Sequence, residues 1–256
     1  MTLPAANILQ PLIDVANGVL QFFHDNVGLS WGMSIIALTV VTRALLVPLT
    51  YKQLKGMRAL QALQPQIKEL QEKFKNDKQR MQQEMMRIYK ENKVNPFASC
   101  IPLIAQLPVF ITLFYVLRHE LPPDMGCPSA GHCAAYGAEF FFIDDLTAKA
   151  QGAELIVLLV LYVGTQLVSG MVMSLTADKS QRTMMFLLPL IFVPFILNFP
   201  AGLILYWITT NIWTIGQQFV IQKVVPVPVM ATPAGAAAVQ GAKPPPKPPR
   251  KKKKRR

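Results

Sequence analysis

Several familiar catalytic signatures are missing from this chain of 256 residues. It contains no HExxH metalloprotease motif, no GxSxG nucleophile elbow, no Walker phosphate loop and no GxGxxG dinucleotide fingerprint. Its three cysteines are too few for a disulfide-built scaffold. No Lys or Arg precedes Arg43, so the basic segment that begins a secretory signal peptide is also missing. These absences argue against a hydrolase, a nucleotide-driven enzyme and a small disulfide-rich domain, and no cofactor or metal is expected.

What the chain does contain is apolar sequence and positive charge. It is 52% hydrophobic with a mean hydropathy of +0.31, a balance that is typical of a polytopic membrane protein rather than a soluble domain. A bilayer core of ~30 Å needs about 20 apolar helical residues to cross it. The sequence therefore predicts an all-α membrane protein whose core, residues 28–222, has five transmembrane helices at about 29–51, 96–117, 154–176, 183–198 and 203–221.

The remaining segments are too polar to span a bilayer. Residues 1–27 predict an interfacial amphipathic helix, and residues 52–93 predict a helical hairpin with a turn at 75–78. Residues 118–153 form a polar loop, and residues 223–256 read as a disordered basic tail. Pro48 is expected to kink or end the first span. The apolar positions of the amphipathic helix are Ile8, Leu12, Val15, Val19, Phe22 and Phe23.

Charge distribution predicts the orientation of the chain. The hairpin carries eleven Lys and Arg against five acids, and the tail ends in a basic run. The loop at 118–153 has only Arg118 and Lys149 against five acids. Because cytoplasmic loops are enriched in Lys and Arg, we expect the amino end outside and the carboxyl end in the cytoplasm of a bacterial cell membrane.

One charge, Arg43, lies deep within the first predicted span. An arginine at the bilayer centre costs at least ~2.5 kcal/mol, and no span offers a carboxylate partner. It either snorkels toward the cytoplasm or lies in a hydrated groove. Such a groove would use neutral polar residues near Arg43 and on later spans. The candidates for this substrate-binding groove are Thr39, Thr42, Gln106, Trp207 and Asn211.

Two cysteines lie six residues apart in the polar loop, within GCPSAGHC. On an extracytoplasmic face, Cys127 and Cys133 could form a disulfide; otherwise they are two free thiols. A metal site with His132 has suitable atoms but too few ligands.

Three stretches together resemble the YidC/Oxa family of membrane protein insertases, in its short bacterial form without a large periplasmic domain. They are TRALLVPLTYKQLKGMRALQALQPQIKELQEKF (Thr42–Phe74), NPFASCIPLIAQLPVFITLFY (Asn95–Tyr115) and FPAGLILYWITTNIWTIGQQFVI (Phe199–Ile221). The resemblance covers roughly residues 10–222, in the order of the family.

The resemblance implies a function and a role for several positions. Arg43 matches the groove arginine that contacts the hydrophilic part of a substrate, and Gln106 and Trp207 match the family's glutamine and tryptophan. The hairpin at 52–93 matches a mobile cytoplasmic loop, and the tail resembles tails that bind ribosomes. The implied partners are nascent membrane proteins, the ribosome and the lipid bilayer, with the Sec translocon and signal recognition components as further candidates.

Two alternatives use the same features differently. A small-solute transporter or channel would be expected to show inverted repeats, and none is found among the predicted spans. A membrane assembly scaffold would use the hairpin and tail for docking, with an incidental groove.

Overall fold

The computed structural model describes residues 4–95, 101–174 and 179–224. Within these ranges there is no β-strand, only two isolated bridges, Phe140–Ile143 and Lys149–Pro200. The helical elements in chain order are α1 (Pro4–Gln21), η1 (Phe22–Asn26), α2 (Trp31–Leu45), α3 (Val47–Ala62), α4 (Gln64–Lys73), α5 (Lys78–Glu91), α6 (Ile101–Tyr115), η3 (Val116–Glu120), α7 (Leu121–Met125), η4 (Ala134–Tyr136), α8 (Gly152–Ser174), α9 (Lys179–Ile196) and α10 (Ala201–Val224).

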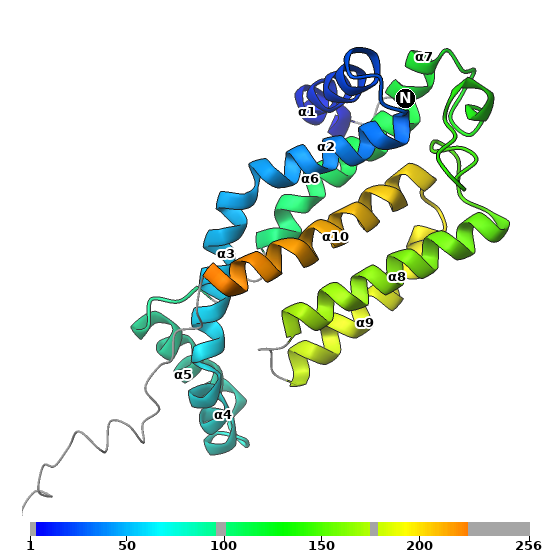
Figure 1. The fold of residues 1–256 in the computed structure, drawn as a ribbon. Helices are drawn as coiled ribbons and strands as arrows, with labels where there is room; N and C mark the ends of the chain where they lie inside the picture. The colour runs from blue at the N-terminus through cyan, green and yellow to red at the C-terminus, as the bar shows by residue number, and fades with distance from the viewer. Residues whose placement is uncertain (1–3, 96–100, 175–178, 225–256) are drawn as a thin grey trace, which may run out of the picture.

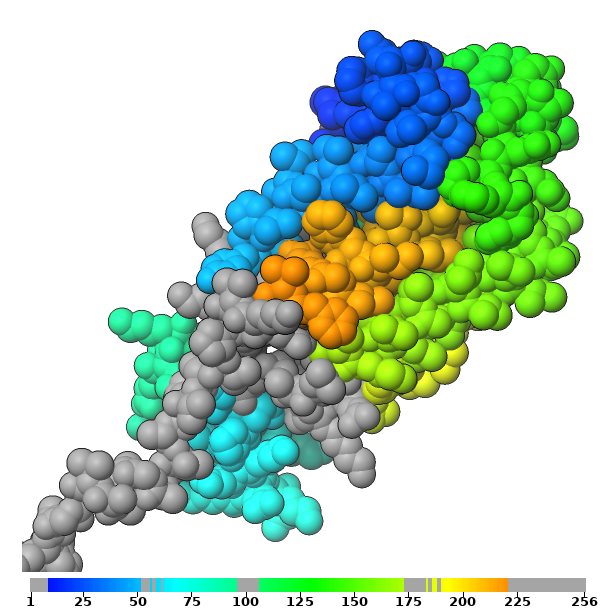
Figure 2. Space-filling view, in the orientation of Figure 1, coloured from blue at the N-terminus to red at the C-terminus, as the bar shows by residue number. Residues whose placement is uncertain are grey.

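The long helices form an elongated bundle (Figure 1). Helix α10 lies between α2 and α8, and α9 packs on α8 (Figures 1 and 2). Helices α4 and α5 lie at one end of the bundle, whereas α1, α7 and the loop at 126–151 lie at the other. The two ends carry the two kinds of polar segment that the sequence distinguishes, the basic hairpin and the acidic loop.

The first predicted span is two helices rather than one. Helix α2 ends at Leu45, and α3 begins at Val47 and continues to Ala62, eleven residues beyond the predicted end of the span. Pro48 lacks an amide hydrogen for the carbonyl of Ala44, so the helix is interrupted where the sequence predicts a kink. Beyond the break α3 departs from the direction of α2 (Figure 1).

Three other helical segments differ in extent from the predicted spans. The chain stays helical past residue 117 through η3 and α7, because Pro122 and Pro123 lie in the first turn of α7, where proline is tolerated. Helix α9 has 18 residues rather than 16, since Lys179 and the residues after it continue the helix. Helix α10 starts two residues early and extends to Val224. Polar residues at these helix ends obscured the boundaries.

Helix α1 has an exposed and a packed apolar face, and the predicted apolar positions include both, since Val19 packs against the core. Leu12, Val15 and Phe22 are exposed, whereas Ile13 and Leu20 are buried in the core. Helix α1 packs on α6 and α2, and the amide of Asn17 donates to Asp124 of α7 at 2.8 Å. An exposed apolar face beside a packed one suits a helix that lies between protein and lipid.

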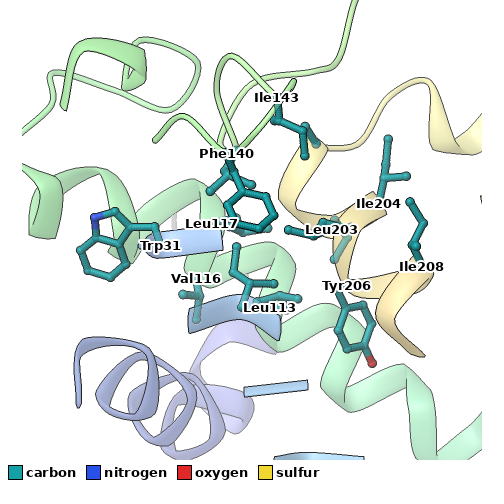
Figure 3. Close-up of a cluster of buried hydrophobic side chains, with 14 of the residues drawn as sticks. Trp31, Leu113, Val116, Leu117, Phe140, Ile143, Leu203, Ile204, Tyr206 and Ile208 are labelled. Carbon is teal, nitrogen blue, oxygen red and sulfur yellow. The ribbon is translucent and has the colours of Figure 1, made fainter. Parts of the chain in front are cut away.

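The packed core lies toward the α7 end of the bundle. Buried apolar side chains from α2, α6, η3, the loop and α10 meet there (Figure 3). Gly32 in the first turn of α2 allows the ring of Phe140 to approach the helix backbone closely, because a Cβ at this position would lie 2.2 Å from Cγ of Phe140. Buried apolar residues on α10 end at Ile208, so the part of α10 nearer α3 is less tightly packed.

Large apolar side chains are exposed along α8 and α9. Val160 is 65% exposed and Phe195 is 60% exposed. By length and composition, one described helical segment, Gly152–Val172, is suited to cross a membrane, and the apolar helix Trp31–Leu45 is shorter. The structure therefore fits an all-helical membrane protein, while the count of five spans stays a prediction.

At the opposite end, α4 and α5 pack against each other. Asp77 caps α5 by accepting from the amide of Arg80 at 3.0 Å. The apolar side chains of the predicted seam, from Ile67 to Ile88, are buried or half-buried. The start of the predicted second span at 96–100, the end of the third at 175–176 and the tail from 225 lie outside the described residues.

Candidate functional site

Arg43 lies in the last turn of α2, partly buried against α10. Its guanidinium is close enough to the hydroxyl of Tyr206 on α10 to interact electrostatically. Among the residues that the structure describes, no carboxylate forms an ion pair with Arg43.

The two threonines beside Arg43 use their hydroxyls within α2. Thr39 donates to the carbonyl of Ile35 at 2.7 Å, and Thr42 donates to the carbonyls of Leu38 and Thr39, each at 2.9 Å. Bonds of this kind satisfy a hydroxyl in an apolar setting without a second helix. Thr39 is also buried, so the first span supplies little polar surface other than Arg43 itself.

A cleft of about 650 Å³ opens between α3 and the second half of α10. Val47 and Tyr51 line it from α3, one and two helical turns beyond Arg43. Arg43 and Tyr206 come before these stretches in the chain and are not among the residues that line the cleft. The lining from α10 is Ile212, Trp213, Gly216, Gln217 and Val220.

The walls of this cleft are almost entirely apolar, which differs from the hydrophilic groove that the sequence suggests. Its one amide side chain, Gln217, accepts a hydrogen bond from Nε1 of Trp213 at 3.0 Å. The amide nitrogen of Gln217 is buried and has no partner among the described residues. This nitrogen is therefore enclosed by protein and adds no polar surface to the cleft.

Trp207 lies in an aromatic cluster between α6, α8 and α10. Its ring stacks on Phe110 with centroids 5.2 Å apart, meets Phe199 edge-on at 5.7 Å and lies 5.9 Å from Tyr162. Gln106 precedes Phe110 by one turn of α6, and its buried amide nitrogen has no partner within the described ranges. Trp207 therefore packs helices together, and Gln106 is a second unused donor.

Asn211 faces α8. It is buried, and its amide donates to the hydroxyl of Thr165 at 3.2 Å. The structure thus brings Arg43, Thr39 and Thr42 together on α2, but it directs Asn211 into the α8–α10 interface. Tyr206, which the sequence analysis did not select, is the α10 residue near Arg43. Tyr206 lies four residues before Thr210, so the two polar side chains share one face of α10, and this spacing was the available signal. Sequence alone does not show which side of α10 meets α2.

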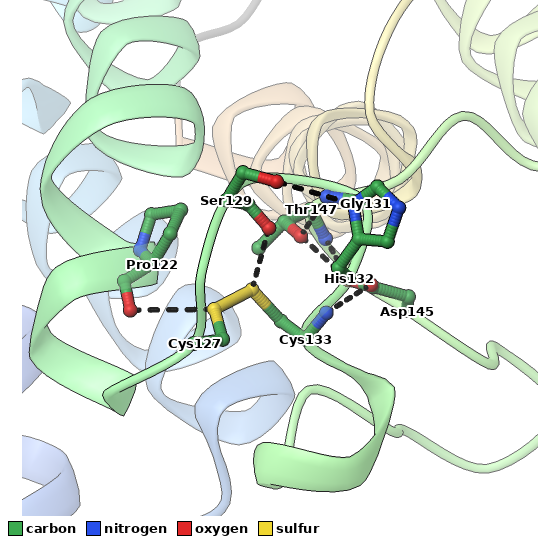
Figure 4. The surroundings of a disulfide bond; sticks show 8 residues. All are labelled: Pro122, Cys127, Ser129, Gly131, His132, Cys133, Asp145 and Thr147. Atoms are coloured by element: carbon green, nitrogen blue, oxygen red, sulfur yellow. Dashed lines mark hydrogen bonds between the residues drawn. A yellow bond between two sulfur atoms is a disulfide. The ribbon is translucent and has the colours of Figure 1, made fainter.

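Cys127 and Cys133 form a disulfide in the loop, with Cα atoms 5.3 Å apart (Figure 4). Both cysteines are buried. His132 points away from them and contacts the hydroxyl of Ser129 at 3.1 Å. Within the described ranges, no three His, Cys, Asp or Glu side chains gather as metal ligands would.

Comparison with known proteins gives a consistent result. A family model described as "60Kd inner membrane protein" matches residues 22–227. A protein named "Membrane protein insertase YidC" from Streptomyces avermitilis is 36% identical over 234 residues, which cover 81% of this chain and 55% of that protein. A protein of the same name from Mannheimia succiniciproducens is 39% identical, and the match covers 84% of this chain and 37% of that protein. Another from Histophilus somni is also 39% identical, and the match covers 76% of this chain and 34% of that protein.

A solved structure also matches. It is described as "Active YidC insertase crystal structure with the first transmembrane domain resolved", with a TM-score of 0.63 and 24% identity. The match covers 84% of this chain and 46% of that one, and it shows a common fold. The chain spans about half or less of the length of the relatives it matches.

Proposed function

This chain belongs to the 60Kd inner membrane protein family, and from that membership we propose that it is an insertase that moves nascent membrane proteins into the bilayer. The observation that carries the proposal is Arg43, a cation without a carboxylate ion-pair partner among the described residues, four residues before Val47, which lines an apolar cleft. Such a site suits a polypeptide that is acidic at one end and apolar at the other.

The first step of the proposed mechanism is electrostatic. A substrate carboxylate about 6 Å from Arg43 would gain about 3 kcal/mol at an effective dielectric constant of ~20. This gain is similar to the ~2.5–3.5 kcal/mol that a lone arginine costs inside a membrane. Binding of an acidic, hydrophilic segment beside Arg43 is therefore favoured over the state in which Arg43 has no anionic partner.

The cleft walls would hold the apolar part of the same substrate. Val47, Ile212 and Val220 offer apolar contact to that part. Transfer of the substrate helix into lipid then gains ~0.8 kcal/mol per buried CH₂ group. The exposed apolar side chains of α8 and α9 give that helix a surface along which to leave. No bond-making step is required.

The membrane placement follows from the charge distribution. We propose a multi-pass protein of a bacterial inner membrane, with α4 and α5 in the cytoplasm and the disulfide loop outside. The hairpin is rich in cations, and its Arg87 pairs with Glu91 at 2.8 Å and with Glu84 at 3.5 Å. Binding of ribosomes by the basic tail, and cooperation with a Sec translocon or signal recognition components, are further proposals.

The test compares substrates and variants in proteoliposomes. A single-span substrate with an acidic amino-terminal segment is compared with a matched substrate whose acids are replaced by amides. We expect Arg43→Ala to slow insertion of the acidic substrate by about 100-fold, equivalent to the ~3 kcal/mol above, and to affect the amide substrate much less. Arg43→Lys keeps the charge and should retain most activity.

Arg87→Gln is the matched control, because it removes one exposed cation at the hairpin. It should leave both substrates unaffected. Equal insertion of the acidic substrate by the native chain and by Arg43→Ala would refute the electrostatic mechanism and favour the scaffold alternative.

A further inference from the structure

A second pocket, of about 240 Å³, lies at the end of the molecule opposite the hairpin. Three separate stretches form it: Arg118 in η3, residues 130–151 of the loop, and the turn between α9 and α10. The start of α10 is joined to the loop by backbone hydrogen bonds from the amide of Ala201 to the carbonyl of Ala148 at 2.7 Å and from the amide of Gly202 to the carbonyl of Leu146 at 2.9 Å. The lining residues are Arg118, Ala130, Gly131, Thr147, Ala148, Lys149, Gln151, Asn198 and Pro200.

One wall of this pocket is internally cross-linked (Figure 4). The amide of Gly131 donates to the hydroxyl of Thr147 at 2.8 Å, and that hydroxyl donates to Asp145 at 2.6 Å. The disulfide between Cys127 and Cys133 closes the short loop that carries Gly131. The wall is therefore held by covalent and hydrogen bonds, which gives the pocket a defined shape.

The pocket collects the two basic residues of an otherwise acidic loop. Arg118 and Lys149 are the only Lys or Arg within 118–153, where five acids are present. In the described part of the chain neither forms an ion pair. Arg118 lies over the ring of Phe114 at 5.5 Å, and Lys149 donates to the side-chain oxygen of Asn198 at 3.3 Å. Both cations therefore remain available to an anion.

The acid nearest the wall, Asp145, opposes an anion only weakly. It is buried, and its two oxygens accept three hydrogen bonds, from the amide of Cys133 at 2.7 Å, the amide of Thr147 at 2.8 Å and the hydroxyl of Thr147. Donors of this kind offset much of the charge of a carboxylate. The two cations are exposed on the pocket side, so the positive charge dominates there.

The pocket lies at the ends of the long helices. Arg118 follows α6 by three residues, Gln151 directly precedes α8, Asn198 follows α9 by two, and Pro200 directly precedes α10. In a membrane bundle, helix ends lie at the level of the lipid headgroups. A guanidinium at this level can bind phosphate through two parallel hydrogen bonds.

We propose that this pocket binds the phosphate of a membrane phospholipid in the outer leaflet. Arg118 and Lys149 supply the charge, and Gln151 and Asn198 supply neutral polar contacts. The site is separate from the Arg43 cleft, so the proposal requires the chain to span a membrane but does not require insertase activity.

The test measures phospholipid retention by the purified full-length protein. Phosphatidylglycerol is titrated into the detergent-solubilised protein, and bound lipid is counted by native mass spectrometry. We expect Arg118→Gln/Lys149→Gln to weaken binding by about 30-fold, because each cation near a headgroup strengthens binding about fivefold. Lys149→Arg should bind as the native chain does. Circular dichroism confirms that each variant is folded.

The matched control is Lys78→Gln/Arg87→Gln, which removes two exposed cations from α5 at the opposite end. It should retain lipid. Equal retention by the pocket variant and the native chain, or equal loss in the control, would overturn the proposal.

Competition with inorganic phosphate distinguishes a lipid headgroup from free phosphate as the ligand. Loss of phosphate binding in the pocket variant with unchanged lipid retention would overturn the assignment to lipid.

Discussion

Substituting Gly32 with alanine should loosen the attachment of the disulfide loop to the bundle. Gly32 lies in the first turn of α2, and the added Cβ would lie 2.2 Å from Cγ, 2.3 Å from Cδ2 and 2.8 Å from Cβ of Phe140. Phe140 is anchored by paired backbone hydrogen bonds with Ile143, each of 2.8 Å. Because the contact involves the base of the ring as well as its edge, a simple rotation of the side chain does not relieve it.

The size of the effect follows from these distances. Ordinary contacts begin near 3.4 Å, so the ring must move at least 1.2 Å from its 2.2 Å position. Phe140 is only 8% exposed, and overpacking of such a core typically costs 1–3 kcal/mol. The better helix propensity of alanine offsets up to about 1 kcal/mol. We expect a net loss of about 1–2 kcal/mol, or a Tm lower by about 2–8 °C.

Thermal unfolding in detergent, followed by circular dichroism, measures this loss. Gly164→Ala is the matched control, because nothing lies within 4 Å of its added Cβ and α8 should become slightly more stable. In a Phe140→Ala background the ring is gone, so the cost of Gly32→Ala should fall by at least about 1 kcal/mol. A Gly32→Ala protein as stable as the native chain would refute this reasoning.

Three further predictions concern the same loop and the helix interface behind the cleft. Replacing Cys127 and Cys133 with serine should lower the free energy of unfolding by about 2 kcal/mol for a disulfide loop of this length. Reductant should lower the Tm of the native chain by the same amount as the substitution and leave the Tm of the variant unchanged. Asp145→Ala removes the acceptor of three buried hydrogen bonds and should cost about 2–3 kcal/mol in thermal unfolding; an unchanged Tm would contradict the bonded wall. Asn211→Leu breaks the bond to Thr165 between α8 and α10 and should cost only about 0.6–1 kcal/mol, measured by unfolding in a denaturing detergent; a loss above 2 kcal/mol would indicate a larger role.

Local features of the fold were predictable because they depend on neighbouring residues. The break near Pro48 follows from a missing amide hydrogen, and the turn before α5 follows from Asp77 as a cap. The cysteines lie six residues apart in one loop, which keeps them within reach of each other. Helix ends beyond residue 117 and before residue 183 were less predictable, since polar residues continue a helix as readily as they end it.

The faces of the helices were harder to predict. In α1 the pattern selected Leu12 and Val15, although Ile13 and Leu20 face the core. Both sets recur at helical spacing, and the position of α6 decides which set is buried. The same uncertainty applied to α10, where the adjacent residues Tyr206 and Trp207 point to different neighbours.

The sequence by itself determined that the chain is helical and apolar, that a single arginine lies within its first long apolar run, and that this arginine lacks a nearby acid. These properties follow from composition, periodicity and charge along the chain. Only the tertiary structure decided that Tyr206 lies within electrostatic range of Arg43, that α3 and α10 line an apolar cleft, and that Arg118 and Lys149 share a pocket with Asn198. Contacts between distant segments depend on the rotation and register of packed helices, which no local pattern specifies.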